Sequence, residues 1–441
     1  MKKLANTNKH IIILIVFLLL HSVRLLGQES KTFASINELF VYAKTSNLSF
    51  KNADLQTKLA KITKKIAIGN AFNPKIPTSA QALNNINQQI SFLPGQAFGL
   101  PANTFKEVTI GQQFVSTFSV QPQFDIINMA NFSQIKSAKI NQELIENQNR
   151  INEQNLYEKI SSVYFNILSF NGQKEILDEN ITLAKDIFRI TKNKFTEGIA
   201  RKQEVNEAES NLILLQDKLE QIEMNTKIQY QILNLFFENK IDSKLSQFIW
   251  SFENTENILV PKNNLMIENA RLQSLLAKQE YRTLNYQNLP VLSFVSAFNW
   301  QNSSNENFFS KNSNWINYNY LGLKLSYDFP TTIQKISNLK NKQIQITVLK
   351  NNEEHAQKEN QNRNIQLVLE YEKAINQKKN FEKIFELKKD TYEKNFNQFK
   401  ENILPLDRLL ISQNDMLISK LNLITTLANI GFNKTKIEIN K

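Results

Sequence analysis

The hydrophobic positions along the chain follow two different periods. Over residues 35–71 apolar residues return every three or four positions, which is the spacing of one helical face. From Val115 to Gln123 apolar and polar residues alternate instead, as they do in a half-buried strand. The alternation ends at Phe124-Asp125, where a helical pattern begins, and the same change recurs at Tyr327-Asp328. The chain therefore makes the same strand-to-helix transition twice.

Residues that break helices are scarce and clustered. Only 9 of the 441 residues are glycine. Residues 123–260 and 331–404 contain no proline, and their only glycines are Gly172 and Gly198. Stretches this free of breakers predict helices of exceptional length.

The same order of elements occurs twice along the chain. The segment "FTEGIARKQEVNEAESNL" aligns with "FKENILPLDRLLISQNDM", which begins 204 residues later, and a repeat of this length indicates two copies of one structural unit. We predict a signal peptide at 1–27; a first repeat over 28–238, with strands near 76–90 and 108–124, a long helix near 128–194 and a return helix at 202–238; an equatorial linker over 239–263; a second repeat over 264–432, with strands near 290–300 and 316–329, a long helix at 333–399 and a return helix at 406–432; and a C-terminal tail at 433–441.

The N-terminus has the composition of a secretory signal. Basic residues precede the apolar run "IIILIVFLLL" at 11–20, and small or neutral residues follow as far as Gly27. A run of ten apolar residues is too short to span a bilayer, which takes about 20. We expect cleavage near Gly27-Gln28 and export of the mature chain without a lipid anchor, since no cysteine follows.

Composition argues against most enzyme classes. The chain has no cysteine, and His355 is the only histidine beyond the leader, so thiol chemistry, imidazole catalysis and histidine-rich metal sites are poorly supplied. The net charge of +12 is spread along the chain rather than concentrated in a basic tract, which argues against nucleic-acid binding. We predict a protein that is not an enzyme and has no cofactor, no metal site and no nucleic-acid partner.

The number of predicted strands matters, because a sheet that spans a membrane must close into a barrel. No apolar run beyond the leader reaches the length of a membrane helix, so a membrane-spanning form of this chain must use strands. A sheet in a bilayer must close on itself, and the smallest closed membrane barrels have about 8 strands. The four strands of one copy cannot close, whereas three copies supply about 12. Helices of about 65 residues must pack side by side in coiled-coil fashion, and their polar surfaces suit a water-filled tube.

The fold class that we predict is therefore mostly α with a small membrane β region. It is a tandem repeat of helix, β-hairpin, long helix and helix, assembled as a trimeric 12-stranded β-barrel that continues as a periplasmic α-helical barrel.

The element order and the segments "SVQPQFD", "LKLSYDF" and "KFTEGIARKQEVNEAESNL" resemble the TolC-like outer-membrane efflux protein family, over essentially the whole mature chain. The second joint lacks the proline of the family pattern, and Asn402 stands where the first tip turn has Gly198. The resemblance implies a homotrimeric duct across the outer membrane and periplasm of a Gram-negative bacterium. It also implies docking onto a periplasmic adaptor protein and an inner-membrane pump such as an RND or ABC transporter, in contact with outer-membrane lipid.

Residues at the two strand–helix joints have two interpretations. Phe124 and Tyr327 fit an aromatic girdle at the lipid interface, although simple core packing explains them nearly as well. Asp125 and Asp328 are expected to cap the helices that follow, in preference to binding ions in the pore.

Residues at the tip turns are candidates for docking. Gly198, Ile199 and Ala200 in the first copy, with Asn402 and Ile403 in the second, occupy the place where the resemblance puts the adaptor contact. A plain helix–helix turn with a left-handed residue predicts the same residues, and both readings can hold together.

Acidic residues beyond the turns are candidates for a gate. The resemblance places a ring of acids near Asp407 and Arg408, whereas a solvated surface pair is the simpler alternative. Glu204, Glu207 and Glu209 are expected to be acids favoured by a helix N-terminus.

The main alternative function is an exported periplasmic or surface coiled-coil scaffold or adhesin without a pore. Two alternating hairpins at matching places in a repeat argue against it, because a scaffold does not need them. The cargo, the pump family and the resting state of the duct stay open.

Overall fold

The computed structural model describes residues 29–441 except 239–240, 253–259, 263 and 331. The predicted signal peptide and parts of the predicted linker lie outside the described residues. Within the described part of the chain, no helix combines the length and the apolar character needed to cross a bilayer.

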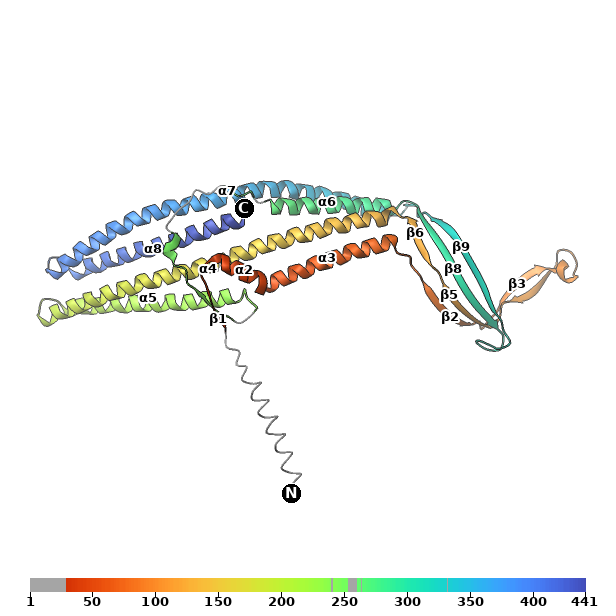
Figure 1. Cartoon of the computed structure of the whole chain (residues 1–441), viewed down its shortest axis with the longest axis horizontal. Helices are drawn as coiled ribbons and strands as arrows, with labels where there is room; N and C mark the ends of the chain where they lie inside the picture. Colours follow the sequence, from red (N-terminus) through yellow and green to blue (C-terminus); the bar gives the residue numbers. More distant parts are fainter. Residues whose placement is uncertain (1–28, 239–240, 253–259, 263, 331) are drawn as a thin grey trace, which may run out of the picture. The chain divides into compact units, whose positions relative to one another are not determined.

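The predicted mostly helical tandem repeat is confirmed (Figure 1). The two long helices, α4 and α7, have 68 residues each and begin 204 residues apart. The first copy consists of α2 Ile36–Ser46, α3 Leu48–Phe72, β2 Thr78–Asn84, β3 Gln89–Pro94, the 3-10 helix η1 Gly95–Phe98, β4 Phe105–Ile110, β5 Phe114–Val120, β6 Gln123–Ile127, α4 Met129–Thr196 and α5 Lys202–Asn234. The second copy consists of α6 Leu265–Tyr286, β8 Val291–Ser304, β9 Trp315–Ser326, α7 Ile333–Lys400 and α8 Leu406–Ile439. Strand β1 Glu29–Phe33 precedes the first copy, and β7 Ile241–Leu245 and the 3-10 helix η2 Ile249–Phe252 join the copies.

The helical stretch predicted at 35–71 is divided in two at Asn47. Its backbone is extended there, with φ −90° and ψ 132°. The Asn47 side chain accepts a hydrogen bond from the Ser49 amide at 2.7 Å and donates one to the Phe236 carbonyl at 2.7 Å. Asn47 therefore starts α3 while it ties the end of α2 to the end of α5.

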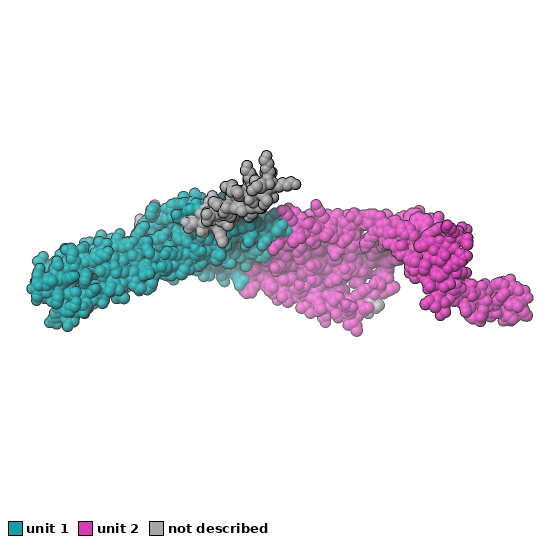
Figure 2. All heavy atoms as spheres, turned by 90° about the horizontal axis from the view of Figure 1, so that it is seen from below, with its two compact units in different colours: residues 1–55, 148–266, 357–441 teal, residues 56–147, 267–356 magenta. Residues whose placement is uncertain are grey.

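Two compact units make up the described chain (Figure 2). Unit 1 comprises the described parts of residues 1–55, 148–266 and 357–441, and unit 2 comprises residues 56–147 and 267–356. Unit 1 holds the two turns that join α4 to α5 and α7 to α8. Unit 2 holds the strands from β2 to β9 apart from β7. Helices α3, α4, α6 and α7 contribute residues to both units.

The main core of unit 1 lies where α4, α5 and α8 meet. Tyr164 and Leu177 of α4, Leu233 of α5 and Ile424 of α8 are fully buried in this core. Close packing continues at Gly431, where an added Cβ atom would overlap the ring of Phe165. This core includes strands β1 and β7, which pair in parallel and were not predicted.

The sheet of unit 2 has the order β2-β5-β8-β9, with β6 also on β8. Strands β5 and β6 run along the same edge of β8 and are separated at Pro122, because proline has no amide to donate to the ladder. The predicted strand near 108–124 is therefore wrong as a single strand, and so is the one near 76–90. The segment between β2 and β5 instead forms a separate hairpin of β3 and β4, joined by η1.

The two faces of this sheet differ in chemistry. Cross-strand partners place Phe294 opposite Leu323 and Trp300 opposite Phe118, so these side chains share one face. The opposite face carries Ser293 paired with Lys324 and Gln301 paired with Thr117. One face of the sheet thus carries the leucines of β9 and large aromatic side chains, whereas the other mixes polar residues with smaller apolar residues such as Val291 and Val295.

Both return helices end at a different residue from the one predicted. Helix α5 ends at Asn234, and Phe237 turns into the core of unit 1 beside Phe33, with the ring centroids 6.1 Å apart. The predicted tail at 433–441 is wrong, because α8 continues to Ile439. Ile430 and Ile437, seven residues apart on one helix face, are 1% and 0% exposed.

Candidate functional site

The two turns that join the long helices to the return helices have the same backbone geometry. Gly198 has φ 74° and Asn402 has φ 62°, so both residues are left-handed. In the first turn the Ile199 amide donates to the Lys194 carbonyl at 2.8 Å. In the second turn the amide that follows Asn402 donates to the Gln398 carbonyl at 2.9 Å. The prediction that asparagine replaces glycine as the left-handed residue is confirmed, and the motif closes both helices by satisfying their last carbonyls.

The two turns lie against each other around a small cavity. The cavity measures about 310 Å³, and Ile199, Ala200, Asn402 and Ile403 all line it. Ile199 is 54% exposed and Ile403 is 72% exposed, so the turns present apolar side chains to solvent. Four of the five predicted tip residues therefore share one surface, while Gly198 supplies the turn of the backbone.

Lys194 is a tip residue that sequence reasoning missed. Its ammonium group donates to the Phe399 carbonyl and stands 4.0 Å from the centroid of the Phe399 ring, which joins the ends of α4 and α7. Burial lowers the pKa of Lys194 below its usual range, although the nearby charge of Glu204 opposes this shift. Aligned phenylalanines at 195 and 399 mark the two turns in the sequence, but no local pattern marks Lys194.

The candidate gate residues occupy the first turn of α8. Asp407 and Arg408 are both exposed, and neither has a hydrogen-bond or ion-pair partner within the described residues. Their neighbours Leu406 and Leu409 are 1% and 0% exposed, so packing holds this turn in place. The position of Asp407 is thus defined, while its role in a gate stays a prediction.

The acid at the start of α5 has a structural role. The amide of Arg201 donates to Glu204 Oε2 at 2.8 Å, so this carboxylate satisfies a free donor at the helix N-terminus. The interpretation of Glu204 as a first-turn acid is confirmed. The same interpretation is wrong for Glu207 and Glu209, which lie exposed beyond the first turn of the helix.

The prediction that aspartates cap the long helices is wrong at the first joint. Asp125 belongs to β6, where it accepts hydrogen bonds from Ser293 Oγ at 2.7 Å and Asn128 Nδ2 at 2.8 Å. The residue that caps α4 is Asn128, whose Oδ1 accepts from the Asn131 amide at 3.1 Å. Asp125 cannot cap α4 itself, because the strand continues two residues beyond it. Its carboxylate instead orients the capping residue Asn128 and ties β6 to β8.

The same prediction is wrong at the second joint. Asp328 has a side chain that is 92% exposed and pairs with Lys335 Nζ at 3.3 Å. The cap of α7 is Thr332, whose hydroxyl accepts from the Lys335 amide at 3.3 Å. The helix begins five residues after Asp328, so that carboxylate lies too early in the chain to cap it.

The aromatic residues at the joints are partly exposed. Phe124 is 42% exposed and packs on Phe294 of β8, with the ring centroids 5.4 Å apart. Tyr327 is 44% exposed and contacts the edge of Phe329, with the ring centroids 4.6 Å apart. Each ring is thus packed in part and exposed in part. This arrangement agrees with a lipid-interface girdle and with simple packing.

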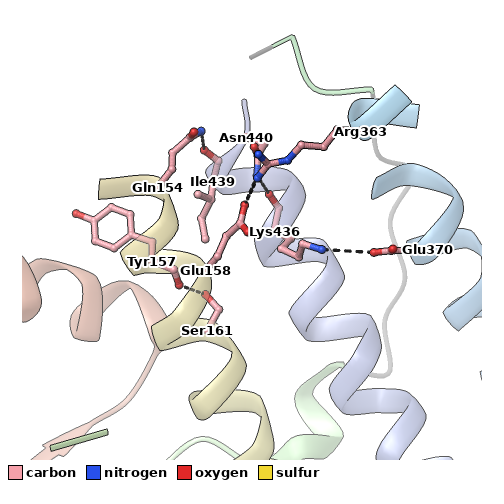
Figure 3. Close-up of polar contacts among 9 residues, drawn as sticks. All are labelled: Gln154, Tyr157, Glu158, Ser161, Arg363, Glu370, Lys436, Ile439 and Asn440. Atoms are coloured by element: carbon pink, nitrogen blue, oxygen red, sulfur yellow. Dashed lines mark hydrogen bonds and ion pairs between the residues drawn. The ribbon is translucent and has the colours of Figure 1, made fainter. Parts of the chain in front are cut away.

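A polar cluster fastens the C-terminus of the chain to the long helices (Figure 3). Glu158 Oε1 of α4 accepts from Arg363 Nη2 of α7 at 2.7 Å and from Asn440 Nδ2 at 3.0 Å. Gln154 Nε2 donates to the Ile439 carbonyl at 2.9 Å, which satisfies a carbonyl at the end of α8. One carboxylate of α4 thereby holds both α7 and the end of α8.

The described residues contain no group of three or more metal-binding side chains that could hold a metal ion. His355 is exposed on α7.

Comparison with known proteins supports one family. The family model described as outer membrane efflux protein matches residues 44–235. A comparison with curated proteins found no match for the sequence.

Several solved structures have the same fold. The CmeC outer membrane channel of Campylobacter jejuni is 15% identical with a TM-score of 0.69, over 92% of this chain and 85% of that one. The outer membrane protein VceC of Vibrio cholerae is 12% identical with a TM-score of 0.67, over 91% of this chain and 94% of that one. The structure of CusC is 14% identical with a TM-score of 0.73, over 91% of this chain and 90% of that one. The likeness therefore extends over both repeats.

The predicted family resemblance is confirmed by the match to the first repeat and by a fold shared along nine-tenths of the chain. The chain is similar to outer membrane efflux proteins over residues 44–235, and it shares the fold of solved outer-membrane channels along about nine-tenths of its length.

Proposed function

We propose that the protein is the passive outer-membrane exit duct of a tripartite efflux or type I secretion system. Three copies form the duct, and a periplasmic adaptor joins it to an inner-membrane pump of the RND or ABC type. The observation that carries this proposal is the pair of unpaired edges of the unit 2 sheet. Within the described residues β2 pairs only with β5, and β9 pairs only with β8. A single bridge joins Lys75, which precedes β2, to Gln123 of β6.

Open edges are costly in a membrane, because hydrocarbon offers no partner to unpaired amides and carbonyls. The edge strand β9 is also apolar where it lies open. Leu321, Leu323 and Leu325, on the same face of β9, are 70%, 68% and 71% exposed. Pairing β9 of one copy with β2 of the next removes both edges, and lipid covers the leucines.

The width of the closed sheet favours three copies. Four strand positions per copy give eight strands for two copies and 12 for three. An interior of about eight strands is filled by side chains, whereas larger barrels enclose a channel. The face that carries Ser293, Lys324 and Gln301 would then line the water-filled bore, and the face that carries the leucines of β9 would meet lipid.

The helices also carry rows of apolar side chains that are exposed in the single chain. Leu59, Ile62 and Ile66 of α3 follow a spacing of three and four residues and are 61%, 51% and 57% exposed. Leu214 and Ile228 of α5, which are 14 residues apart, are 66% and 54% exposed. Seams of this kind are typical of coiled-coil packing, and neighbouring copies would cover them.

The tip turns are the proposed contact with the adaptor. They carry exposed apolar side chains around the 310 Å³ cavity that both repeats share. We further propose that Asp407 and Arg408 narrow the periplasmic entrance, since any residue near the axis of a three-fold tube appears three times. The cargo would be selected by the pump, so small molecules, ions and proteins are all compatible with the duct.

Cross-linking of paired cysteines tests the assembly, and the absence of native cysteine makes the result unambiguous. Gln81→Cys in β2 is combined in turn with Asn319→Cys, Tyr320→Cys or Leu321→Cys in β9. We expect oxidation of at least one pair to give covalent dimers and trimers and nothing larger, while each single variant stays monomeric on denaturing gels. Ladders beyond the trimer, or no cross-link from any pair, would contradict a closed ring of three.

A coiled-coil scaffold or adhesin without a pore is the alternative. Under that alternative the protein would fractionate away from membranes, and substitutions on the two faces of β9 would be tolerated equally.

A further inference from the structure

A second cavity, larger than the one at the tips, lies in unit 1 between α4, α7 and α8. It measures about 610 Å³ and shares no lining residue with the tip cavity. Leu183 of α4, Phe385 and Phe396 of α7 and Met416 of α8 give it an apolar lining. Sites for small molecules have volumes of about 300–1,000 Å³ and mainly apolar walls with a few fixed polar groups, and this cavity meets the first two conditions.

Two buried polar side chains meet the third condition. Asn180 of α4 and Tyr392 of α7 line the cavity and are only 2% and 5% exposed. Within the described residues, neither Asn180 Oδ1 nor the Tyr392 hydroxyl has a hydrogen-bond partner. Buried polar atoms are almost always bonded in native proteins, because leaving them unpaired costs free energy. Both atoms therefore point to a missing partner.

The surroundings of these two atoms define what such a partner must offer. Asn180 Nδ2 already donates to the Ile176 carbonyl at 2.9 Å, so the free Oδ1 needs a donor. The ring of Tyr392 stacks on Phe396 with the centroids 5.9 Å apart, which holds its hydroxyl in place. Burial, with a smaller contribution from the charge of Asp186, raises the pKa of Tyr392 to about 12. The hydroxyl is therefore neutral near pH 7 and can donate or accept.

The charges at the rim are balanced. Glu179 and Lys420 form an ion pair, and Lys389 and Glu393 contribute one further charge of each sign. A rim with two bases and two acids does not select an anion or a cation. The apolar lining and the balanced rim together favour a neutral ligand.

We propose that this cavity is a binding site for a small neutral aromatic molecule that carries a hydrogen-bond donor, that is, a phenol or an aryl amine. The aromatic body packs between Phe385, Phe396 and Met416, and its polar group donates to Asn180 Oδ1 and accepts from the Tyr392 hydroxyl. An ordered water would satisfy the same two atoms but would leave the apolar lining uncovered. The site does not depend on the duct being a trimer or on its partners.

Binding here has a mechanical consequence. The ligand contacts α4, which belongs to the first repeat, and α7 and α8, which belong to the second repeat. Because it bonds to both repeats about five turns of α4 before the tip turn, it braces the two helical hairpins against each other. A ligand that binds only the folded state also raises the apparent thermal stability.

The test uses the purified full mature chain in detergent and 4-(trifluoromethyl)phenol as the probe, followed by fluorine NMR. We expect saturable binding of one probe per chain, in addition to a non-saturable signal from the micelles that detergent alone reproduces. Tyr392→Phe and Asn180→Leu should each weaken saturable binding about fivefold to tenfold, the effect of one neutral hydrogen bond. Leu183→Trp, which fills the cavity, should abolish it.

Tyr371→Phe is the matched control, since Tyr371 is a buried tyrosine of α7 outside the cavity. It should bind the probe as the parent does. Tyr392→Phe preserves the shape of the side chain, so circular dichroism should show an unchanged helical fold. Absence of saturable binding in the parent would overturn the proposal. Equal affinities of the parent, Tyr392→Phe and Asn180→Leu, which is the result expected if the cavity holds only water, would do so as well.

Discussion

Placing a charge on the leucine face of β9 should prevent stable insertion in the membrane. Leu323 lies opposite Phe294 in the register and is 68% exposed in the single chain, so in the assembled barrel its side chain should meet lipid. An arginine facing lipid near the midplane of a barrel costs about 2–4 kcal/mol. Leu323→Arg should therefore lower the folding equilibrium of each chain by roughly 30- to 700-fold. Three copies in one assembly should lose on the order of 6–12 kcal/mol in total.

The neighbouring residue provides the control for this experiment. Gly322 lies opposite Val295 on the other face of the sheet, and a Cβ added there meets no atom within 4 Å. Gly322→Arg adds the same charge one residue away, toward the proposed bore, where water can solvate it. It should assemble in the outer membrane much as the parent does.

The assay is outer-membrane fractionation followed by unboiled gel electrophoresis, with urea unfolding in lipid vesicles to measure the free-energy loss. We expect Leu323→Arg to lose the trimer band and Gly322→Arg to keep it. If the two variants assembled equally well, or failed equally, the alternation of lipid and lumen faces along β9 would be refuted.

Three further predictions concern the helices and the entrance. Ile160→Pro, at a fully buried position in α4, should cost about 3 kcal/mol or more and abolish trimers on unboiled gels, and normal trimers would mean that α4 is not continuous. Gly431→Ala should lower the thermal unfolding temperature, because its Cβ overlaps a buried ring and overpacking costs about 1–3 kcal/mol. Gly69→Ala, at a helical position where only a side-chain tip lies close, should raise that temperature, because alanine favours a helix over glycine by about 1 kcal/mol. Temperature shifts of the same sign in the two variants would argue against the close packing of Gly431 on Phe165. Asp407→Ala should lower cation selectivity in planar bilayers and Arg408→Ala should raise conductance, whereas two variants identical to the parent would remove these residues from the gate.

The repeat and its long helices were predictable because they depend on local patterns. The segments that lack proline and are nearly free of glycine predicted α4 and α7 within two residues at each end. The offset of 204 residues correctly placed Asn402 in the left-handed position of Gly198. Both inferences depend only on the neighbours of each residue in the chain.

The features that were missed depend on contacts between distant segments. Strands β1 and β7 pair across more than two hundred residues, and neither has an alternating pattern long enough to reveal it. The local pattern predicts that the strand ends at Asp125, which would make this residue a helix cap. Its hydrogen bonds to Ser293 and Asn128 depend on the register of β6 with β8, which the sequence does not state. The local sequence predicts a tail at the end of α8, because no local pattern shows that Glu158 and Gln154 of α4 hold this end by hydrogen bonds.

The tip residues lie between these two cases. The alignment of the repeats identified both turns, but it did not show that the turns share one cavity or that Lys194 links them through Phe399. That arrangement requires α4 and α7 to end side by side, which is a property of the tertiary structure.

The central claim is that three chains together form one continuous conduit. Electron cryo-microscopy of the detergent-extracted protein tests it most directly, because a single image reconstruction shows copy number, edge pairing and bore together. The account predicts a three-fold particle in which β9 of each copy pairs with β2 of the next and one bore runs through both the sheet and the helices. A single chain, or an assembly with open sheet edges and no bore, would contradict it.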